Sequence, residues 1–468
     1  MTAASCSAVR RPTGRLRVAG AIPLLLVAGM ALLPACSPSD PASTAPHDPT
    51  STFATTTTGT AAPPSTTTTP TTTTLASGPA TREPLTPDQL RANYDLSPVY
   101  ASGITGKGTT IGIVDVFGSP TLRHDLAVFD SHFHLPPPPS FKIVEPAGTV
   151  PPFSATRKNA LGWAGETTLD VEMAHAIAPG ARIVLAVTGV DEVEGLSGFA
   201  EIVKAERYLI DSEHVSVISQ SFAATEETFP SVASLMALRS VFLLAAQRGV
   251  SIVSASGDGG ATSNRLNPTH LYNRRVVSWP ASDPLVTAVG GTQVSLDGAG
   301  AAVQPPSGWS GSGGGISAVF NRPSWQAGVQ AVVGDHRGLP DIAMVASCSP
   351  GVEIYETRVD TAGSGFGPSC GTSAAAPMFA GIVALADQLA GHDLGLLNPA
   401  IYRLGERRAP GIVDVTTGNN SAVVPVGDHT VVVKGYRATT GYDLVTGWGT
   451  VDARYFVPEL AGRALPPG

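Results

Sequence analysis

Five short apolar runs, separated by stretches with helical character, most constrain how this chain can fold. They occupy residues 108–115, 181–188, 215–219, 249–255 and 286–289. Continuous apolar runs of this length are typical of strands buried on both faces of a parallel sheet. The stretches expected to form helices between them include residues 167–178, 198–212 and 232–248. This alternation predicts an α/β fold with a doubly wound, mainly parallel sheet and flanking helices, in which ligands bind beyond the carboxyl ends of the strands.

Residues 1–36 have the features of an export signal. Its basic residues are Arg10, Arg11, Arg15 and Arg17. The apolar stretch that follows, residues 18–33, is too short and too close to the terminus to be assigned as a transmembrane span. The sequence Leu33-Pro34-Ala35-Cys36 then resembles a bacterial lipobox, which predicts a lipid on Cys36. Ordinary cleavage by a signal peptidase is the alternative.

Residues 37–83 are expected to form a disordered stalk, because this stretch of Thr, Ser, Pro and Ala cannot bury a core. The folded domain is predicted to cover residues 84–458, with residues 459–468 as a tail. These features together predict an extracellular protein, either secreted or anchored to the membrane as a surface lipoprotein.

Composition bears on partners and on the redox environment. The chain has 29 lysines and arginines against 37 aspartates and glutamates, a net charge of -8. This balance argues against nucleic acid as a partner, and we expect a monomer. In an exported protein, Cys348 and Cys370 are expected to form a disulfide, the alternative being two buried thiols.

Ser373 is the candidate nucleophile. It follows Gly371 and Thr372 at the expected start of a helix whose next residues are small. A serine there gains from the positive end of the helix dipole, although such a serine can also simply cap the helix. The segment from Gly371 to Pro377 resembles the nucleophile motif shared by subtilisins and by sedolisins, the serine-carboxyl peptidases.

Glu166 and Asp170 are the candidate base. They are four residues apart, so both project from one face of the expected helix. The segment from Gly165 to Ala181 is similar to the subtilisin segment that carries the catalytic histidine, but Glu166 stands at the histidine position. Glutamate, three residues and aspartate, followed by Ala-Pro-Gly-Ala, is the sedolisin pattern. A pair of close carboxyls shares a proton and works in acid, where histidine is already protonated. His175, nine residues after Glu166, is the rival base, but its spacing does not match the subtilisin motif.

Asp258 is the candidate oxyanion group. It ends a buried run in a glycine-rich turn, where a structural aspartate could also cap its own loop. Subtilisins have an asparagine here that donates a hydrogen bond to the tetrahedral intermediate, and sedolisins resemble this chain in having aspartate. An aspartate donates only when protonated, which suits an acid enzyme. Asp115, at the end of the first core strand, is expected to support the carboxyl pair or to be structural.

The resemblance also implies where substrate and metal bind. Residues 215–222 resemble the strand whose free edge pairs with substrate, so Ser219 and Gln220 are expected substrate contacts. Gly313 and Gly314 are similar to the glycine wall of sedolisin clefts, where backbone approaches the peptide closely. Two C-terminal segments resemble the halves of the sedolisin calcium site, which implies one Ca²⁺ held by all-oxygen ligands. The implied ligands are the carboxylates of Asp414 and Asp443 and the carbonyls of Val415, Thr439 and Gly441.

The expected function is that of an exported serine-carboxyl endopeptidase, which hydrolyses polypeptides in acid through an acyl-enzyme. Two alternatives stay open. One is a subtilisin-type enzyme that uses Asp115, a histidine and Ser373 near neutral pH. The other is a catalytically silent surface lipoprotein that binds peptide or cell wall. The presence of all four catalytic candidates favours the first.

Overall fold

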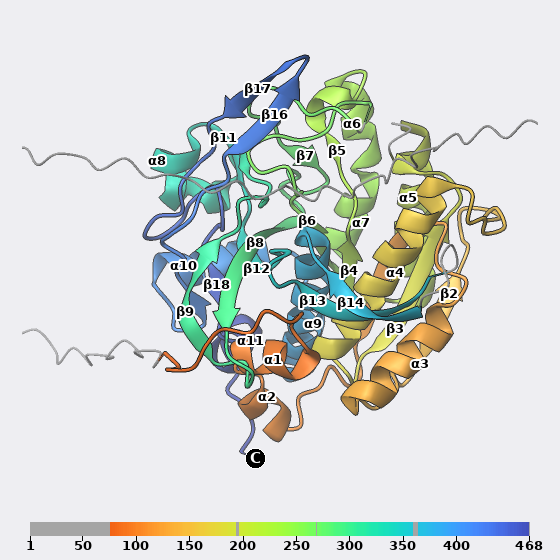
Figure 1. The fold of residues 1–468 in the computed structure, drawn as a ribbon, viewed down its shortest axis with the longest axis vertical. Coiled ribbons are helices and arrows are strands. Elements are labelled where there is room, and N and C mark those ends of the chain that lie inside the picture. The colour runs from red at the N-terminus through yellow and green to blue at the C-terminus, as the bar shows by residue number, and fades with distance from the viewer. Residues whose placement is uncertain (1–74, 193–195, 268, 359–363, 468) are drawn as a thin grey trace, which may run out of the picture. The chain divides into compact units, whose positions relative to one another are not determined.

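The computed structural model describes residues 75–192, 196–267, 269–358 and 364–467 (Figure 1). The predicted export signal, Cys36 and most of the predicted stalk lie outside these residues.

An eight-stranded sheet forms the centre of the fold, with the strand order β12-β8-β6-β4-β1-β3-β2 and with β9 paired to β8. These strands are β1 Thr110–Val116, β2 Phe141–Val144, β3 Arg182–Thr188, β4 Val217–Gln220, β6 Ser251–Ala255, β8 Thr287–Leu296, β9 Ala302–Gly308 and β12 Ile342–Val345. Every pair is parallel except β8 with β9. The chain adds strands on the β3 side of β1 and then returns to its β4 side. The carboxyl ends of β1 and β4 therefore flank a topological switch point, the usual place for a binding site.

Helices cover both faces of the sheet and bury two separate apolar cores (Figure 1). Ile111 and Ile113 of β1 face one core, and Val114 and Val116 face the other. The first core contains α3 Leu122–Phe133, α4 Lys158–Ile177, α9 Thr372–Ala390 and α11 Ala453–Ala461. The second contains α5 Leu196–Tyr208, α6 Val232–Leu238 and α7 Ser240–Arg248. The predicted fold class is confirmed.

Helices α4 and α9 pack tightly against each other, and this contact positions the site. At their crossing, a Cβ atom on Gly381 would lie 2.7 Å from Cβ of Ile177, so a glycine is needed for the approach. Helix α9 is long and apolar enough to span a membrane by composition, but 83% of the relevant window is buried inside the protein. It is therefore the central core helix of this fold.

The remaining elements form the periphery. The short helices are α1 Pro87–Asn93, α2 Ser97–Ala101, α8 Gln330–Val333 and α10 Asn398–Glu406. The paired strands outside the central sheet are β5 Ala224–Thr225 with β7 Ser278–Trp279, β10 Gly315–Asn321 with β11 His336–Leu339, β13 Val352–Thr357 with β14 Ser364–Ser369, β15 Ile412–Val413 with β18 Thr450–Val451, and β16 Ala422–Val426 with β17 His429–Val433.

Two predicted domain boundaries need correction. The folded part begins before residue 84, because the amides of Ala76 and Thr81 donate to the carbonyls of Ala302 and Leu296 at 2.8 and 2.7 Å. At the other end, the boundary at 458 falls inside α11, which continues to Ala461. Helix α4 also begins at Lys158, well before residue 167, so Glu166 lies within the helix rather than in its first turn.

Candidate active site

Gly371 and Asp258 meet at the start of α9, where they join the turn after β6 to this helix. Gly371 has a φ of 102°. A Cβ atom there would lie 2.6 Å from Oδ2 of Asp258, so only glycine fits. The amide and hydroxyl of Thr372 donate to Oδ1 of Asp258 at 2.7 and 2.9 Å. Asp258 is thereby fixed beside the first turn of the helix that carries Ser373.

Glu166 of α4 reaches the Ser373 hydroxyl from the neighbouring helix. Burial raises the pKa of Glu166 to about 8, and a hydrogen bond with Ser373 opposes the rise. Oε1 of Glu166 is buried without a hydrogen-bond partner. A carboxyl that contacts a serine hydroxyl in this way is placed to accept its proton.

Asp170 lies one turn further along α4 and is fully buried. The hydroxyl of Ser221 donates to its Oδ1 at 2.8 Å, whereas its Oδ2 has no hydrogen-bond partner. Burial, together with Asp115 and Glu166, raises the pKa of Asp170 well above its usual range. Ser221 was not assigned a role from the sequence. Its position directly after β4, at the switch point, is the signal that could have found it.

Asp115 completes a cluster of three carboxyls, Asp115, Glu166 and Asp170, which we call the carboxyl cluster. Asp115 is fully buried near the end of β1, and neither of its carboxyl oxygens has a hydrogen-bond partner. Burial raises its pKa to about 7, with the nearby Thr167 hydroxyl opposing the rise. Its charge in turn raises the pKa of both Glu166 and Asp170.

No cation in the described part of the chain compensates the carboxyl cluster. Among the described residues, the groups that shift these three pKa values, besides burial itself, are carboxyls and hydroxyls. Three buried carboxyls without a cation cannot all ionise, so they share protons and titrate as a unit. Loss of a single proton from the unit is enough to supply a base.

Asp258 has the properties of a group that can be protonated. It retains exposed surface, but the protein packed around its carboxyl desolvates it and raises its pKa, while the hydrogen bonds from Thr372 oppose the rise. Because Oδ1 accepts both of those hydrogen bonds, a proton on this carboxyl would sit on Oδ2. The protonated group could then donate to a developing oxyanion.

His175 is not placed as a rival base. Its ring is fully buried, and Nε2 lies 2.9 Å from the carbonyl of Pro136 and 3.1 Å from Oδ1 of Asp130 in α3. His175 therefore joins α4 to α3, on the side of α4 away from Ser373. Its role is to pack and hold these helices together.

The predicted substrate contacts need correction. The strand from Val217 to Gln220 has no free edge, because β4 pairs with β1 on one side and with β6 on the other. Ser219 and Gln220 are fully buried, and the Gln220 amide donates to Glu206. Gly313 and Gly314 do lie beside the site, but close packing within the protein already requires a glycine at both positions. Cβ atoms there would lie 2.2 Å from the carbonyls of Ser256 and Leu444, respectively.

The predicted disulfide between Cys348 and Cys370 is confirmed. It joins the two ends of the β13–β14 hairpin, immediately before Gly371. The hairpin is also held to the helices by buried carboxylates. The Thr357 amide and hydroxyl donate to Asp125 of α3, and the Tyr355 amide donates to Glu172 of α4 at 3.0 Å.

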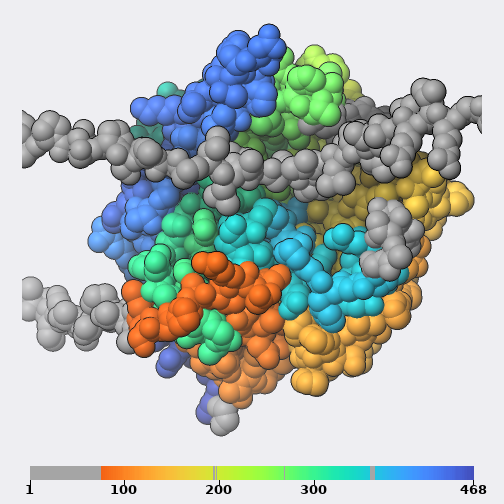
Figure 2. Space-filling view, viewed as in Figure 1, coloured from red at the N-terminus to blue at the C-terminus, as the bar shows by residue number. Residues whose placement is uncertain are grey.

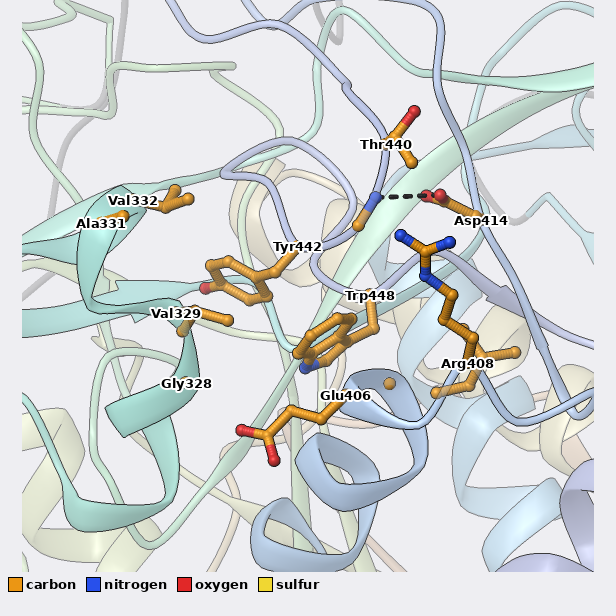
Figure 3. A pocket seen from close by; sticks show the side chains of 13 residues that line it. Gly328, Val329, Ala331, Val332, Glu406, Arg408, Asp414, Thr440, Tyr442 and Trp448 are labelled. Carbon is orange, nitrogen blue, oxygen red and sulfur yellow. Dashed lines mark hydrogen bonds between the residues drawn. The ribbon is translucent and has the colours of Figure 1, made fainter. Parts of the chain in front are cut away.

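The structure brings the two predicted halves of the calcium site together (Figure 3). The Gly441 amide donates to Oδ2 of Asp414 at 2.9 Å, and the Thr439 amide donates to Oδ2 of Asp443 at 2.9 Å. Oδ1 of Asp443 accepts from the amides of Val445 and Thr446. Both carboxylates thus flank one turn, as a two-part oxygen site requires.

Two observations limit the number of ligands that side chains can supply there. No group of three or more His, Cys, Asp and Glu side chains that could hold a metal ion occurs among the described residues. The Arg408 guanidinium also faces Asp414 and lowers its pKa, although burial outweighs it and the net shift is upward (Figure 3). The donor chemistry fits Ca²⁺ only if main-chain carbonyls complete the site.

Known proteins resemble this chain in sequence and fold. The Subtilase family is matched over residues 156–403. Kumamolisin of Bacillus sp. (strain MN-32) is 31% identical over 75% of this chain and 60% of its own length. Sedolisin of Pseudomonas sp. (strain 101) is 30% identical over 81% and 61%, respectively.

The fold likeness extends over the folded part of the chain. A structure of Pseudomonas sedolisin, described as a serine-carboxyl proteinase complexed with two molecules of pseudo-iodotyrostatin, has a TM-score of 0.67 and is 28% identical. The match covers 82% of this chain and 98% of that one. This chain spans about three fifths of the length of kumamolisin and sedolisin. It belongs to the subtilase family and, within it, to the sedolisins.

Proposed function

We propose that this chain is a serine-carboxyl endopeptidase that hydrolyses polypeptides in acid. The observation that carries the proposal is the carboxyl cluster, which reaches the Ser373 hydroxyl through Glu166 and which no cation among the described residues compensates. Kumamolisin and sedolisin, the relatives named above, support the same reaction class.

In this mechanism Ser373 attacks the carbonyl carbon of the scissile bond and gives its proton to Glu166. The negative oxygen of the tetrahedral intermediate accepts a hydrogen bond from protonated Asp258. Glu166 then passes the proton to the leaving amine, and the acyl group stays on Ser373. Water hydrolyses the acyl-enzyme with Glu166 again acting as base and then as acid. Asp170 and Asp115 share protons with Glu166, so the charge of the carboxyl cluster is redistributed as Glu166 gains and loses its proton.

The proposal is tested by hydrolysis of a denatured protein between about pH 3 and about pH 8, a range that brackets the carboxyl and histidine pKa values. We expect most activity in acid and its loss in Glu166→Gln. The matched control is Asp428→Asn, which removes an exposed carboxyl in the β16–β17 turn and should keep activity. Hydrolysis at neutral pH that survives Glu166→Gln would overturn the mechanism. No hydrolysis at any pH would favour a binding protein.

We further propose one Ca²⁺ held by Asp414 and Asp443 with the carbonyls of Val415, Thr439 and Gly441. Bound at these residues, the ion would tie the two halves of the site together and stabilise the fold, by about 2.7 kcal/mol at a concentration 100 times the Kd. Thermal unfolding with Ca²⁺ and with a chelator tests this. We expect a higher Tm with Ca²⁺ for the unchanged protein and no difference for Asp414→Asn. An equal Tm under both conditions in the unchanged protein would contradict the proposed calcium site.

Export, with anchorage through a lipid on Cys36, and a monomeric state remain proposals from the sequence. Incorporation of a labelled fatty acid that is lost in Cys36→Ala would support the anchor. Sedimentation of the purified protein as a single-chain species would support the monomer.

A further inference from the structure

A pocket of about 470 Å³ lies between Gly165, within α4, and one face of the β13–β14 hairpin. Figure 2 shows the hairpin on this face of the molecule, in cyan. The pocket is lined by Gly165, Ile354, Glu356, Gly365, Gly367 and Ser369, among others. Ile354 and Glu356 face this side of the hairpin, and their partners across the strands are Gly367 and Gly365. The pocket is hollow because the opposite strand has no side chains at these two positions.

Neither glycine is required by the fold. Gly365 and Gly367 are not among the glycines with a positive φ. A Cβ atom at either position would meet no other atom within 4 Å. Glycine inside a strand usually weakens it, since it adds conformational freedom to the unfolded chain and packs no side chain. Gly365 and Gly367 lie on the same face of β14, and neither the backbone conformation nor the packing of the protein requires a glycine there. We take this as an indication that the space beside them is occupied by a ligand.

The position of the pocket assigns it to the leaving-group half of the substrate, and this step rests on the proposed function. Glu166 must give its proton to the leaving amine, so the chain that follows the scissile bond passes beside Glu166. Gly165, the neighbour of Glu166, forms one wall of the pocket. Asp258, the oxyanion group, instead contacts Gly371 and Thr372 at the start of α9.

The chemistry of the lining favours a long side chain with a positive end. Ile354 is buried and offers an apolar surface at the base of the hairpin. The Glu356 carboxylate lies against Gly165, with Oε1 3.4 Å from where a Cβ atom would be. One partner of Glu356 is Arg358, at 3.7 Å; the Arg358 side chain is 61% exposed and can turn into solvent when another cation arrives.

We propose that this pocket binds a lysine or arginine side chain at one of the first two residues after the scissile bond. The stem of the side chain would lie over Ile354 and the two glycines, and its charged end would pair with Glu356. This preference would act together with any preference of the enzyme for the residues before the scissile bond.

The test compares peptides that differ only by Lys, Gln or Glu at these two positions. We expect kcat/KM to be about two- to fivefold higher for Lys than for Glu, the size typical of one partly exposed ion pair. Glu356→Gln should abolish the difference. Gly365→Ala, which fills the hollow, should raise KM for the Lys peptide with kcat little changed and with an unchanged or higher Tm.

The matched control is Gly298→Ala in the turn after β8. Gly298 likewise has no atom near an added Cβ and no positive φ, but its carbonyl contacts Gln89 of α1. The Gly298→Ala variant should have an unchanged KM for every peptide. If the unchanged protein cleaves all peptides equally well, or prefers Glu through Arg358, the pocket assignment is wrong. If it cleaves none of them, the proposed function has failed instead.

Discussion

Two buried carboxyl sites in this protein differ in how their charge is balanced. Asp341 pairs with Arg337 at 2.6 Å, accepts from the Ala288 amide at 2.8 Å and from the Tyr402 hydroxyl at 2.9 Å. Burial by itself lowers the pKa of Arg337, but Asp341 and its neighbours outweigh it and the net shift is upward, so Arg337 stays charged. In the carboxyl cluster, by contrast, no guanidinium of the described residues shifts the three pKa values, and several oxygens have no hydrogen-bond partner.

The difference shows two ways of keeping acidic groups inside a fold. Arg337, the Ala288 amide and the Tyr402 hydroxyl oppose the effect of burial on Asp341, although burial still leaves the pKa of Asp341 raised. A partner of opposite charge is fixed beside Asp341, so the charge of this site does not have to be balanced by protons alone. The carboxyl cluster can be compensated only by protons, so its charge follows pH. A site that exchanges protons suits acid–base chemistry, and a paired site does not.

The largest expected effect is the loss of activity when the serine beside the carboxyl cluster is replaced. Ser373→Ala should lower kcat at least about 10³-fold, because the nucleophile is lost and only binding and oxyanion contacts remain. The free energy of unfolding should change little, since Ser373 is a half-buried side chain at the site. Steady-state kinetics and urea unfolding check both. Comparable hydrolysis by the variant would assign the nucleophile elsewhere.

Removing the cation should turn the paired site into an unpaired one. Arg337→Met leaves Asp341 buried and uncompensated, which should lower the free energy of unfolding by about 3–5 kcal/mol near neutral pH. The loss should be smaller at about pH 4, where Asp341 can take a proton. Denaturant unfolding at both pH values measures this. A loss that is equal at the two pH values would mean that Asp341 is compensated by its other partners.

The next largest effect on the free energy of unfolding is expected from loss of the disulfide that precedes Gly371. Replacing Cys348 and Cys370 by alanine opens a loop with a sequence separation of 22 residues. The expected loss is about 3 kcal/mol of unfolding free energy, from the greater freedom of the unfolded chain. Thermal unfolding of the double variant, with the single Cys348→Ala as a comparison, tests whether the bond or merely a side chain is responsible. A double variant as stable as the unchanged protein would contradict the prediction.

The smallest expected effect concerns how stability depends on pH. Burial raises the pKa of Asp115 from its ordinary value to about 7. Its contribution to stability is therefore full below about pH 4, and it is lost as pH rises toward 7, because the unfolded chain releases the proton first. Asp115→Asn should make this decline shallower, because one of the three carboxyls that titrate together no longer does so. Tm measured across the range checks it, and an unchanged slope would mean that Asp115 does not titrate there.

Much of the candidate site could be predicted because each candidate catalytic side chain belongs to a local motif. Ser373, Glu166, Asp170 and Asp258 stand at the ends of strands or on helices that the apolar pattern already indicates. What sequence could not show depends on contacts between distant segments. The Ser221 hydroxyl reaches Asp170 only because β4 and α4 meet at the switch point.

The errors have physical reasons of the same kind. Gln220 was expected to face substrate, but whether a strand lies inside a sheet or at its edge depends on which strands pair with it. The start of α4 was placed too late, since Gly162 and Gly165 weaken the local helical signal while packing of the helix overrides it. Gly365 and Gly367 became informative only when the structure showed empty space beside them.

The most direct test of the central claim is the pH dependence of kcat/KM for one peptide substrate. If protonated Asp258 and the carboxyl cluster activate Ser373, kcat/KM should rise as the cluster loses its first proton and should fall at least about tenfold at higher pH, where Asp258 loses its own proton. A value that instead rises through about pH 6.5 and levels off above it, as a histidine base gives, would contradict the account.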